Sequence, residues 1–154
     1  MTLLAQLAAL VAIVSTGVVY GTDTFSALVQ RPALARVDDA TLTAIMGNVH
    51  RYGDGRLPAP GILGIIAAAA SVVAAVAGHP AGSVTAGAAF LLLVGWVVLY
   101  LRISAPINRT LTAAADARDT GQRPRTATRL GSHHRPRAVV QGLAVAALGV
   151  SLIS

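Results

Sequence analysis

The stretch VTAGAAFLLLVGWVVLYL, residues 84–101, decides the fold class of this chain. It contains no charged residue, and Arg102 follows it directly. As a helix it would be about 27 Å long at ~1.5 Å per residue, slightly short of the roughly 30 Å hydrocarbon core of a bilayer. Extension of the helix or local thinning of the bilayer can cover the difference. The stretch therefore predicts a transmembrane helix.

Three further apolar runs, residues 3–20, 61–76 and 138–153, have the same character. The whole chain is 55% hydrophobic and only 12% charged, whereas a soluble domain has roughly 25% charged residues. We therefore expect an all-α polytopic membrane protein, a single domain over residues 1–154 with a four-transmembrane-helix bundle. The predicted spans cover about residues 3–22, 60–77, 83–102 and 137–153. The first run has no basic segment before it, which favours an uncleaved helix over a signal peptide.

Small residues are frequent within these runs. The second run is rich in alanine, and we interpret it as an interior face of the bundle, because alanine permits close helix approach. Gly87, Gly95, Gly142 and Gly149 suggest close helix contacts in the same way. Codon bias toward small residues is the alternative explanation.

The distribution of arginine predicts the orientation. All twelve basic residues are arginines, and they lie in two segments, residues 31–56 and 102–137. Under the positive-inside rule both segments are cytoplasmic. We expect a multi-pass protein of a bacterial plasma (inner) membrane, with both termini outside and the charged loops toward anionic lipid headgroups. The use of Arg without Lys and Asp without Glu, with abundant Ala, is typical of a GC-rich genome such as that of an actinobacterium.

Each cytoplasmic segment contains a predicted amphipathic helix, at about residues 38–51 and 105–118. Asp38 and Asp39 open the first and Gly53 ends it. Its apolar stripe has helical spacing and consists of Leu42, Ile45, Met46 and Val49. Pro106 suits the first turn of the second helix. Residues 25–29 extend the first span until Pro32 stops it.

Few residues are candidates for catalysis or ligand binding. The absence of cysteine excludes disulfides, thiolate catalysis and iron–sulfur clusters. The apolar runs carry no Asp, Glu, Lys, Arg or His, whereas proton-coupled pumps normally need an ionisable group within the membrane. Asp23 lies just past the first span, where an exposed turn aspartate is the default interpretation. If the first helix continues, Asp23 would lie at the bundle mouth, where an arginine could pair with it.

Three histidines, His50, His133 and His134, share the predicted cytoplasmic rim, but their spacing matches no established metal motif, so no metal site is predicted. The arginine-rich stretch at residues 123–137 has no interleaved aromatic residues, and the topology already accounts for its charge. No binding of nucleic acid is therefore expected.

Three short motifs flank the predicted spans. The first, Gly21-Thr-Asp-Thr-Phe-Ser-Ala-Leu-Val-Gln-Arg-Pro-Ala-Leu34, follows the first span. Pro106-Ile-Asn108 follows the third span, and His134-Arg-Pro-Arg137 opens the fourth. Together they resemble the anthrone-oxygenase-like family, small four-helix membrane proteins also known as a domain of unknown function. Members usually have a tryptophan before the histidine of the last motif, whereas the only tryptophan here is Trp96.

The resemblance implies that Asn108, His134 and Arg137 form a catalytic set at the cytoplasmic rim. Asp23, His50 and Arg31 are candidates for substrate contacts beside them. The implied reaction is oxidation of a hydrophobic aromatic molecule such as an anthrone, which enters from the bilayer. An anthrone anion reacts with oxygen directly, so no cofactor is specified. The alternative is a non-catalytic scaffold or accessory subunit that binds lipids, a membrane-protein partner or a second copy of itself.

Overall fold

The computed structural model describes residues 2–78, 80–118 and 134–153, and all the regular elements among them are helical. The basic segment 119–133, with His133, lies outside the described residues. The elements in chain order are α1 (Leu3–Phe25), the π-helical turn η1 (Ser26–Gln30), α2 (Arg31–Leu34), α3 (Asp39–Arg56), α4 (Pro58–Gly78), α5 (Pro80–Leu99), the π-helical turn η2 (Tyr100–Ser104), α6 (Ala105–Arg118) and α7 (His134–Ile153).

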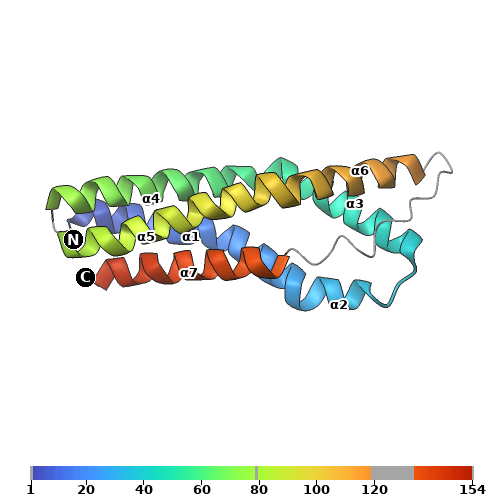
Figure 1. Cartoon of the computed structure of the whole chain (residues 1–154), viewed down its shortest axis with the longest axis horizontal. Coiled ribbons are helices and arrows are strands. Elements are labelled where there is room, and N and C mark those ends of the chain that lie inside the picture. The colour runs from blue at the N-terminus through green and yellow to red at the C-terminus, as the bar shows by residue number, and fades with distance from the viewer. Residues whose placement is uncertain (1, 79, 119–133, 154) are drawn as a thin grey trace.

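Four long helices, α1, α4, α5 and α7, lie side by side, and both chain ends are at the same end of this group (Figure 1). Helix α1 packs on α4 and α7, and α5 packs on the same two helices. Four helical segments are long and apolar enough to cross a membrane: Leu3–Leu34, Pro58–Gly78, Gly82–Ala117 and Pro136–Ile153. The prediction of an all-helical chain with four candidate membrane spans is confirmed.

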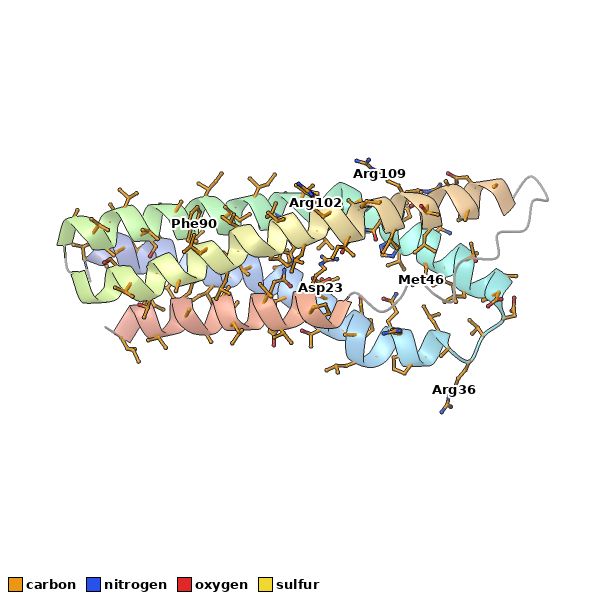
Figure 2. All side chains as sticks on the ribbon, in the orientation of Figure 1. Asp23, Arg36, Met46, Phe90, Arg102 and Arg109 are labelled. Carbon is orange, nitrogen blue, oxygen red and sulfur yellow. The ribbon has the colours of Figure 1, made fainter. Side chains whose placement is uncertain are left out.

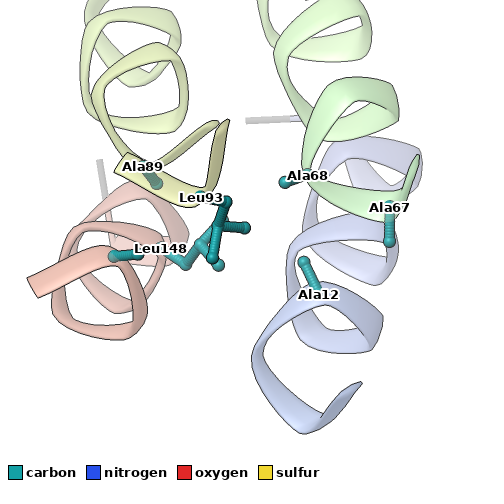
Figure 3. Packing of buried hydrophobic residues seen from close by; sticks show 7 residues of the cluster. Ala12, Ala67, Ala68, Ala89, Leu93 and Leu148 are labelled. Carbon is teal, nitrogen blue, oxygen red and sulfur yellow. The ribbon is translucent and has the colours of Figure 1, made fainter. Parts of the chain in front are cut away.

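Small residues dominate the core between these helices. Ala12, Ala67, Ala68 and Ala89 surround Leu93 and Leu148 (Figure 3). This arrangement agrees with the interior role expected of the alanine-rich run on α4, because alanine lets helix backbones approach.

Gly64 lies at a close contact between α1 and α4. A Cβ added at Gly64 would lie 2.6 Å from the Thr16 hydroxyl oxygen. Of the four glycines expected at close contacts, Gly142 faces the ring of Tyr20, where an added Cβ would lie 3.2 Å from the nearest ring atom. The other three, Gly87, Gly95 and Gly149, have open space beside them, so that prediction is wrong for them.

Two helices continue past prolines that were expected to limit them. The N–H of Arg31 donates to the Ser26 carbonyl across the turn η1, immediately before Pro32. The N–H of Ala105 donates to the Tyr100 carbonyl across η2, immediately before Pro106. A π-helical turn widens the backbone, which relieves the clash of a proline ring with the preceding turn. Pro32 therefore does not stop the first helix, which continues through α2 to Leu34.

Helix α3 begins where the sequence predicts. The carboxylate of Asp38 accepts hydrogen bonds from the N–H of Ala40 (3.0 Å) and of Thr41 (2.9 Å), which is an N-cap. Its bond from the Thr41 hydroxyl, at 2.6 Å, is the main reason that the pKa of the Asp38 carboxyl lies below its usual value. At its other end the helix continues past Gly53 to Arg56.

The buried face of α3 differs from the predicted apolar stripe. Its buried residues are Thr43, Gly47 and His50, whereas Ile45 and Val49 are exposed. The cause is close packing on α6 (Figure 1), where a Cβ on Gly47 would overlap the side chain of Ala115. Backbone proximity, rather than apolar side chains, determines which face turns inward.

Candidate functional site

A pocket of about 330 Å³ opens where the four-helix part meets α3 and α6. Its walls are mostly apolar and include Val19, Leu57, Pro58, Ile62, Ile65, Val97 and Leu101. Its polar lining consists of Thr22, Ser26, Gln30, His50, Asp54, Trp96, Tyr100, Asn108 and Arg137. An apolar cavity with a few convergent polar groups is the usual form of a small-molecule site.

A buried ion pair lies beside this pocket. One Arg137 guanidinium nitrogen, Nη2, lies 3.0 Å from Oδ2 of Asp23, and both side chains are 8% exposed. Figure 2 shows Asp23 among the helices, whereas Arg36 and Arg109 point away from them. Asp23 continues the buried face of α1, which consists of Ala5, Ala9, Ala12, Ser15, Thr16 and Val19. The default interpretation of Asp23 as an exposed turn residue is therefore wrong, because α1 continues past it to Phe25.

Gln141 connects the ion pair to the tryptophan. With its amide oriented to satisfy both neighbours, Gln141 donates to Asp23 Oδ2 and accepts from Trp96 Nε1, each at 3.0 Å. Arg137 and Gln141 begin the buried line of α7, which continues through Ala144, Leu148 and Ser151. Trp96 itself is buried, at 8% exposure.

The arginine also contacts two aromatic rings. The rings of Trp96 and Tyr100 are stacked with their centroids 6.1 Å apart. The guanidinium carbon of Arg137 lies 5.7 Å from the first centroid and 5.1 Å from the second, within the range of a cation–π interaction. Among the described residues, Arg137 Nε has no hydrogen-bond partner. A carboxylate and two rings thus fix the position of the buried cation.

A second carboxylate, that of Asp54, also lines the pocket. Oδ1 of Asp54, near the end of α3, accepts a hydrogen bond from the Tyr100 hydroxyl at 3.0 Å. The same oxygen accepts another from Nδ2 of Asn108 at 2.9 Å. Asp54 therefore links α3, η2 and α6 at one point.

The structure brings some of the six predicted site residues together. Asn108, Arg137 and His50 line the pocket, and Asp23 lies behind Arg137. Arg31 is exposed at the start of α2 and is not among the lining residues. His134 is the first residue of α7, but its side chain lies outside the described part of the chain. Within the described residues, no three metal-ligating side chains are grouped closely enough to hold an ion.

The sequence analysis missed Asp54 and Gln141 and did not foresee that Tyr100 belongs to the site. Helical spacing carried a signal for Gln141, which follows Arg137 by four residues and therefore lies on the same face of the helix. Asp54 carried no such signal, because it does not continue the apolar stripe that the sequence predicts for α3.

No family model matches this sequence, and no curated protein or solved structure matches it significantly.

Proposed function

We propose that this chain is a multi-pass membrane protein whose four long helices cross a bilayer. The outward faces of these helices support the proposal, because they expose large apolar side chains such as Val14 (68%), Val73 (72%) and Leu91 (69%). Apolar surface of this extent is unfavourable in water and is suited to lipid.

The proposed orientation places α2, α3 and α6 in the cytoplasm of a bacterial cell. These elements lie beyond the four-helix part at the end remote from both termini (Figure 1). Seven of the arginines belong to these elements, their connections and η2: Arg31, Arg36, Arg51, Arg56, Arg102, Arg109 and Arg118. The positive-inside rule assigns such a charged end to the cytoplasmic side.

We further propose that the pocket binds a lipophilic aromatic molecule and, as the resemblance to anthrone oxygenases suggests, oxidises it. The observation that carries this proposal is the pocket itself, where apolar walls end in the polar set of His50, Asn108 and Arg137. Ile62 and Leu101 line the pocket and are more than half exposed, at 57% and 59%. A hydrophobic substrate could therefore reach the pocket from the bilayer between α4 and η2.

The reaction proposed for an anthrone balances without a cofactor. A base removes one proton from the ring methylene, and the resulting anion transfers electrons to dioxygen. A carbon–oxygen bond then forms to give a hydroperoxide, which loses water to leave a quinone. One anthrone and one dioxygen thus become one anthraquinone and one water, with the substrate oxidised and dioxygen reduced.

Three residues have proposed roles in this reaction. His134 would take the methylene proton. Asn108 donates one amide hydrogen to Asp54 and can donate its second amide hydrogen to the substrate oxygen. Arg137 would stabilise negative charge that develops on that oxygen, although its pairing with Asp23 offsets part of this effect.

The test is oxygen consumption by purified protein in lipid nanodiscs supplied with an anthrone. We expect stoichiometric conversion to the anthraquinone by the unmodified protein. The variant His134→Ala should be slower by about 10²–10⁴-fold, the usual contribution of a general base. Wild-type inertness toward a broad panel of anthrones would contradict the enzymatic role and favour the non-catalytic scaffold or accessory subunit.

A pair of glycine variants connects this activity to the pocket. A Cβ at Gly61 would lie 3.6 Å from the Trp96 ring, so the longer side chain of Gly61→Leu would extend into the pocket and should block turnover. The matched control is Gly87→Leu on α5, where the added atoms meet open space and activity should be unchanged. Equal activity of both variants would show that the reaction occurs elsewhere.

A further inference from the structure

Asp54 occupies a position in the pocket that the proposed reaction does not use. It is an exposed residue that also lines the cavity, so its carboxylate stands where the pocket meets its surroundings. Both hydrogen bonds that it receives, from Tyr100 and from Asn108, end on the same oxygen, Oδ1. Among the described residues, no hydrogen bond occupies Oδ2.

Tyr100 and Asn108, which donate to Asp54, also have oxygen atoms that can accept a further hydrogen bond. Tyr100 gives its only hydroxyl hydrogen to Asp54, so its oxygen can only accept further bonds. Asn108 is 5% exposed and turns its amide nitrogen toward Asp54, and its carbonyl oxygen has no hydrogen bond within the described residues. This side of the pocket therefore offers three acceptors from three residues and one remaining amide hydrogen.

The charges around the pocket also favour a neutral ligand with a hydrogen to donate. Among the described residues, the pocket lining and the ion pair beside it contain two carboxylates, of Asp23 and Asp54, and the guanidinium of Arg137. The exposed side chain of Arg109 points away from the helices (Figure 2). A ligand that enters as an anion would meet an excess of negative charge, whereas a neutral group with a hydrogen to donate would meet open acceptors.

We infer that Asp54 is a specificity-determining residue that accepts a hydrogen bond from a neutral hydroxyl group on the aromatic ligand. Tyr100 and Asn108 hold the carboxylate through Oδ1 and leave Oδ2 for the ligand. The inference rests on the proposed binding of an aromatic molecule, and it adds which form of that molecule the pocket selects. Hydrogen bonds to a charged acceptor are stronger than neutral ones, so a hydroxyl should be preferred to its methyl ether.

The experiment uses three probes of nearly equal shape: 2-hydroxyanthraquinone, 2-methoxyanthraquinone and anthraquinone-2-carboxylate. Trp96 is the only tryptophan of the chain and lines the pocket, so quenching of its fluorescence reports binding. Titrations of the nanodisc-embedded protein are made at a pH below the pKa of the phenol. We expect the hydroxyl probe to bind at least about tenfold more tightly than the methoxy probe, and the carboxylate to bind most weakly.

The variant Asp54→Asn should reduce the preference for the hydroxyl probe to within about twofold, while the methoxy probe binds as before. The matched control is Asp39→Asn, an exposed aspartate on the same helix that does not line the pocket; it should retain the full preference. If Asp54→Asn does not fold, the comparison of the hydroxyl and methoxy probes in the unmodified protein still tests the inference.

The outcomes separate the two proposals. Equal affinity of the unmodified protein for the hydroxyl and methoxy probes would overturn the role of Asp54 and leave the aromatic pocket intact. An unchanged preference in Asp54→Asn would do the same. Failure of all three probes to quench Trp96 would overturn both the pocket and the inference that rests on it.

Discussion

Replacing Asp23 by asparagine is expected to lower the free energy of unfolding by about 3–5 kcal/mol, the usual cost of removing one partner from a buried ion pair. The charge of Arg137 would remain at 8% side-chain exposure without a counter-ion. Gln141 would also exchange a carboxylate acceptor for a neutral one. Reversible unfolding in mixed micelles, followed by the fluorescence of Trp96, measures the change.

Two comparisons isolate the ion pair from other effects. The double variant Asp23→Asn, Arg137→Gln should recover much of the loss, because no buried charge remains unpaired. The control Asp116→Asn breaks the exposed ion pair between Asp116 and Arg51. The side chain of Arg51 is 47% exposed and that of Asp116 is 60% exposed. It should change stability by about 1 kcal/mol at most. A loss for Asp23→Asn no larger than that of the control would contradict a buried, energetically important ion pair.

Substituting alanine for Gly47 should separate α3 from α6. The new Cβ would overlap the Ala115 side chain and lie 3.0 Å from the Leu111 carbonyl oxygen, and neither atom can rotate away. Overpacking of this kind costs about 1–3 kcal/mol. Because Asp54 on α3 meets Asn108 on α6, the same change should weaken binding of the hydroxyl probe. Hydrogen exchange of α3 amides and the Trp96 titration measure the two effects.

Gly55→Ala provides the comparison on the same helix. A Cβ at Gly55 meets open space, so this change should be neutral or slightly stabilising, as alanine favours helix over glycine. If the two alanine variants exchanged equally slowly in α3, the tight contact between α3 and α6 would not exist as described.

Hydropathy and capping predicted much of the fold because both act over short stretches of sequence. The four apolar runs correspond to α1, α4, α5 and α7. Asp38 caps α3, as expected, by accepting a hydrogen bond from the N–H of Thr41 three residues later. The same reasoning made an exposed turn the default interpretation of Asp23, because a charged residue ends an apolar run even when the helix continues. The alternative, an arginine paired with Asp23 on a continued helix, is the one that the structure shows. The sequence did not indicate which arginine, because Arg137 lies in the first turn of α7, near the other end of the chain.

The candidate site was less predictable for a related reason. Tyr100 and Asn108 lie 46 and 54 residues from Asp54 along the chain, and no local pattern shows that they converge. The two motifs that contain Asn108 and Arg137 were visible in the sequence, and both of these residues line the pocket. The burial of Trp96 could not be predicted from sequence, because an aromatic residue near a helix end is equally compatible with an interfacial or a buried position.

Labelling of single cysteines tests most directly whether lipid surrounds the four helices and the arginine-rich end faces the cytoplasm. The natural chain has no cysteine, so Ile153→Cys, at an 87% exposed position, and Ala113→Cys, on the exposed side of α6, each carry one thiol. A membrane-impermeant maleimide applied to intact cells, with the outer membrane permeabilised if there is one, should label the first variant and spare the second until the inner membrane is broken. Labelling of Ala113→Cys in intact cells, or recovery of the protein in the soluble fraction without detergent, would contradict the account.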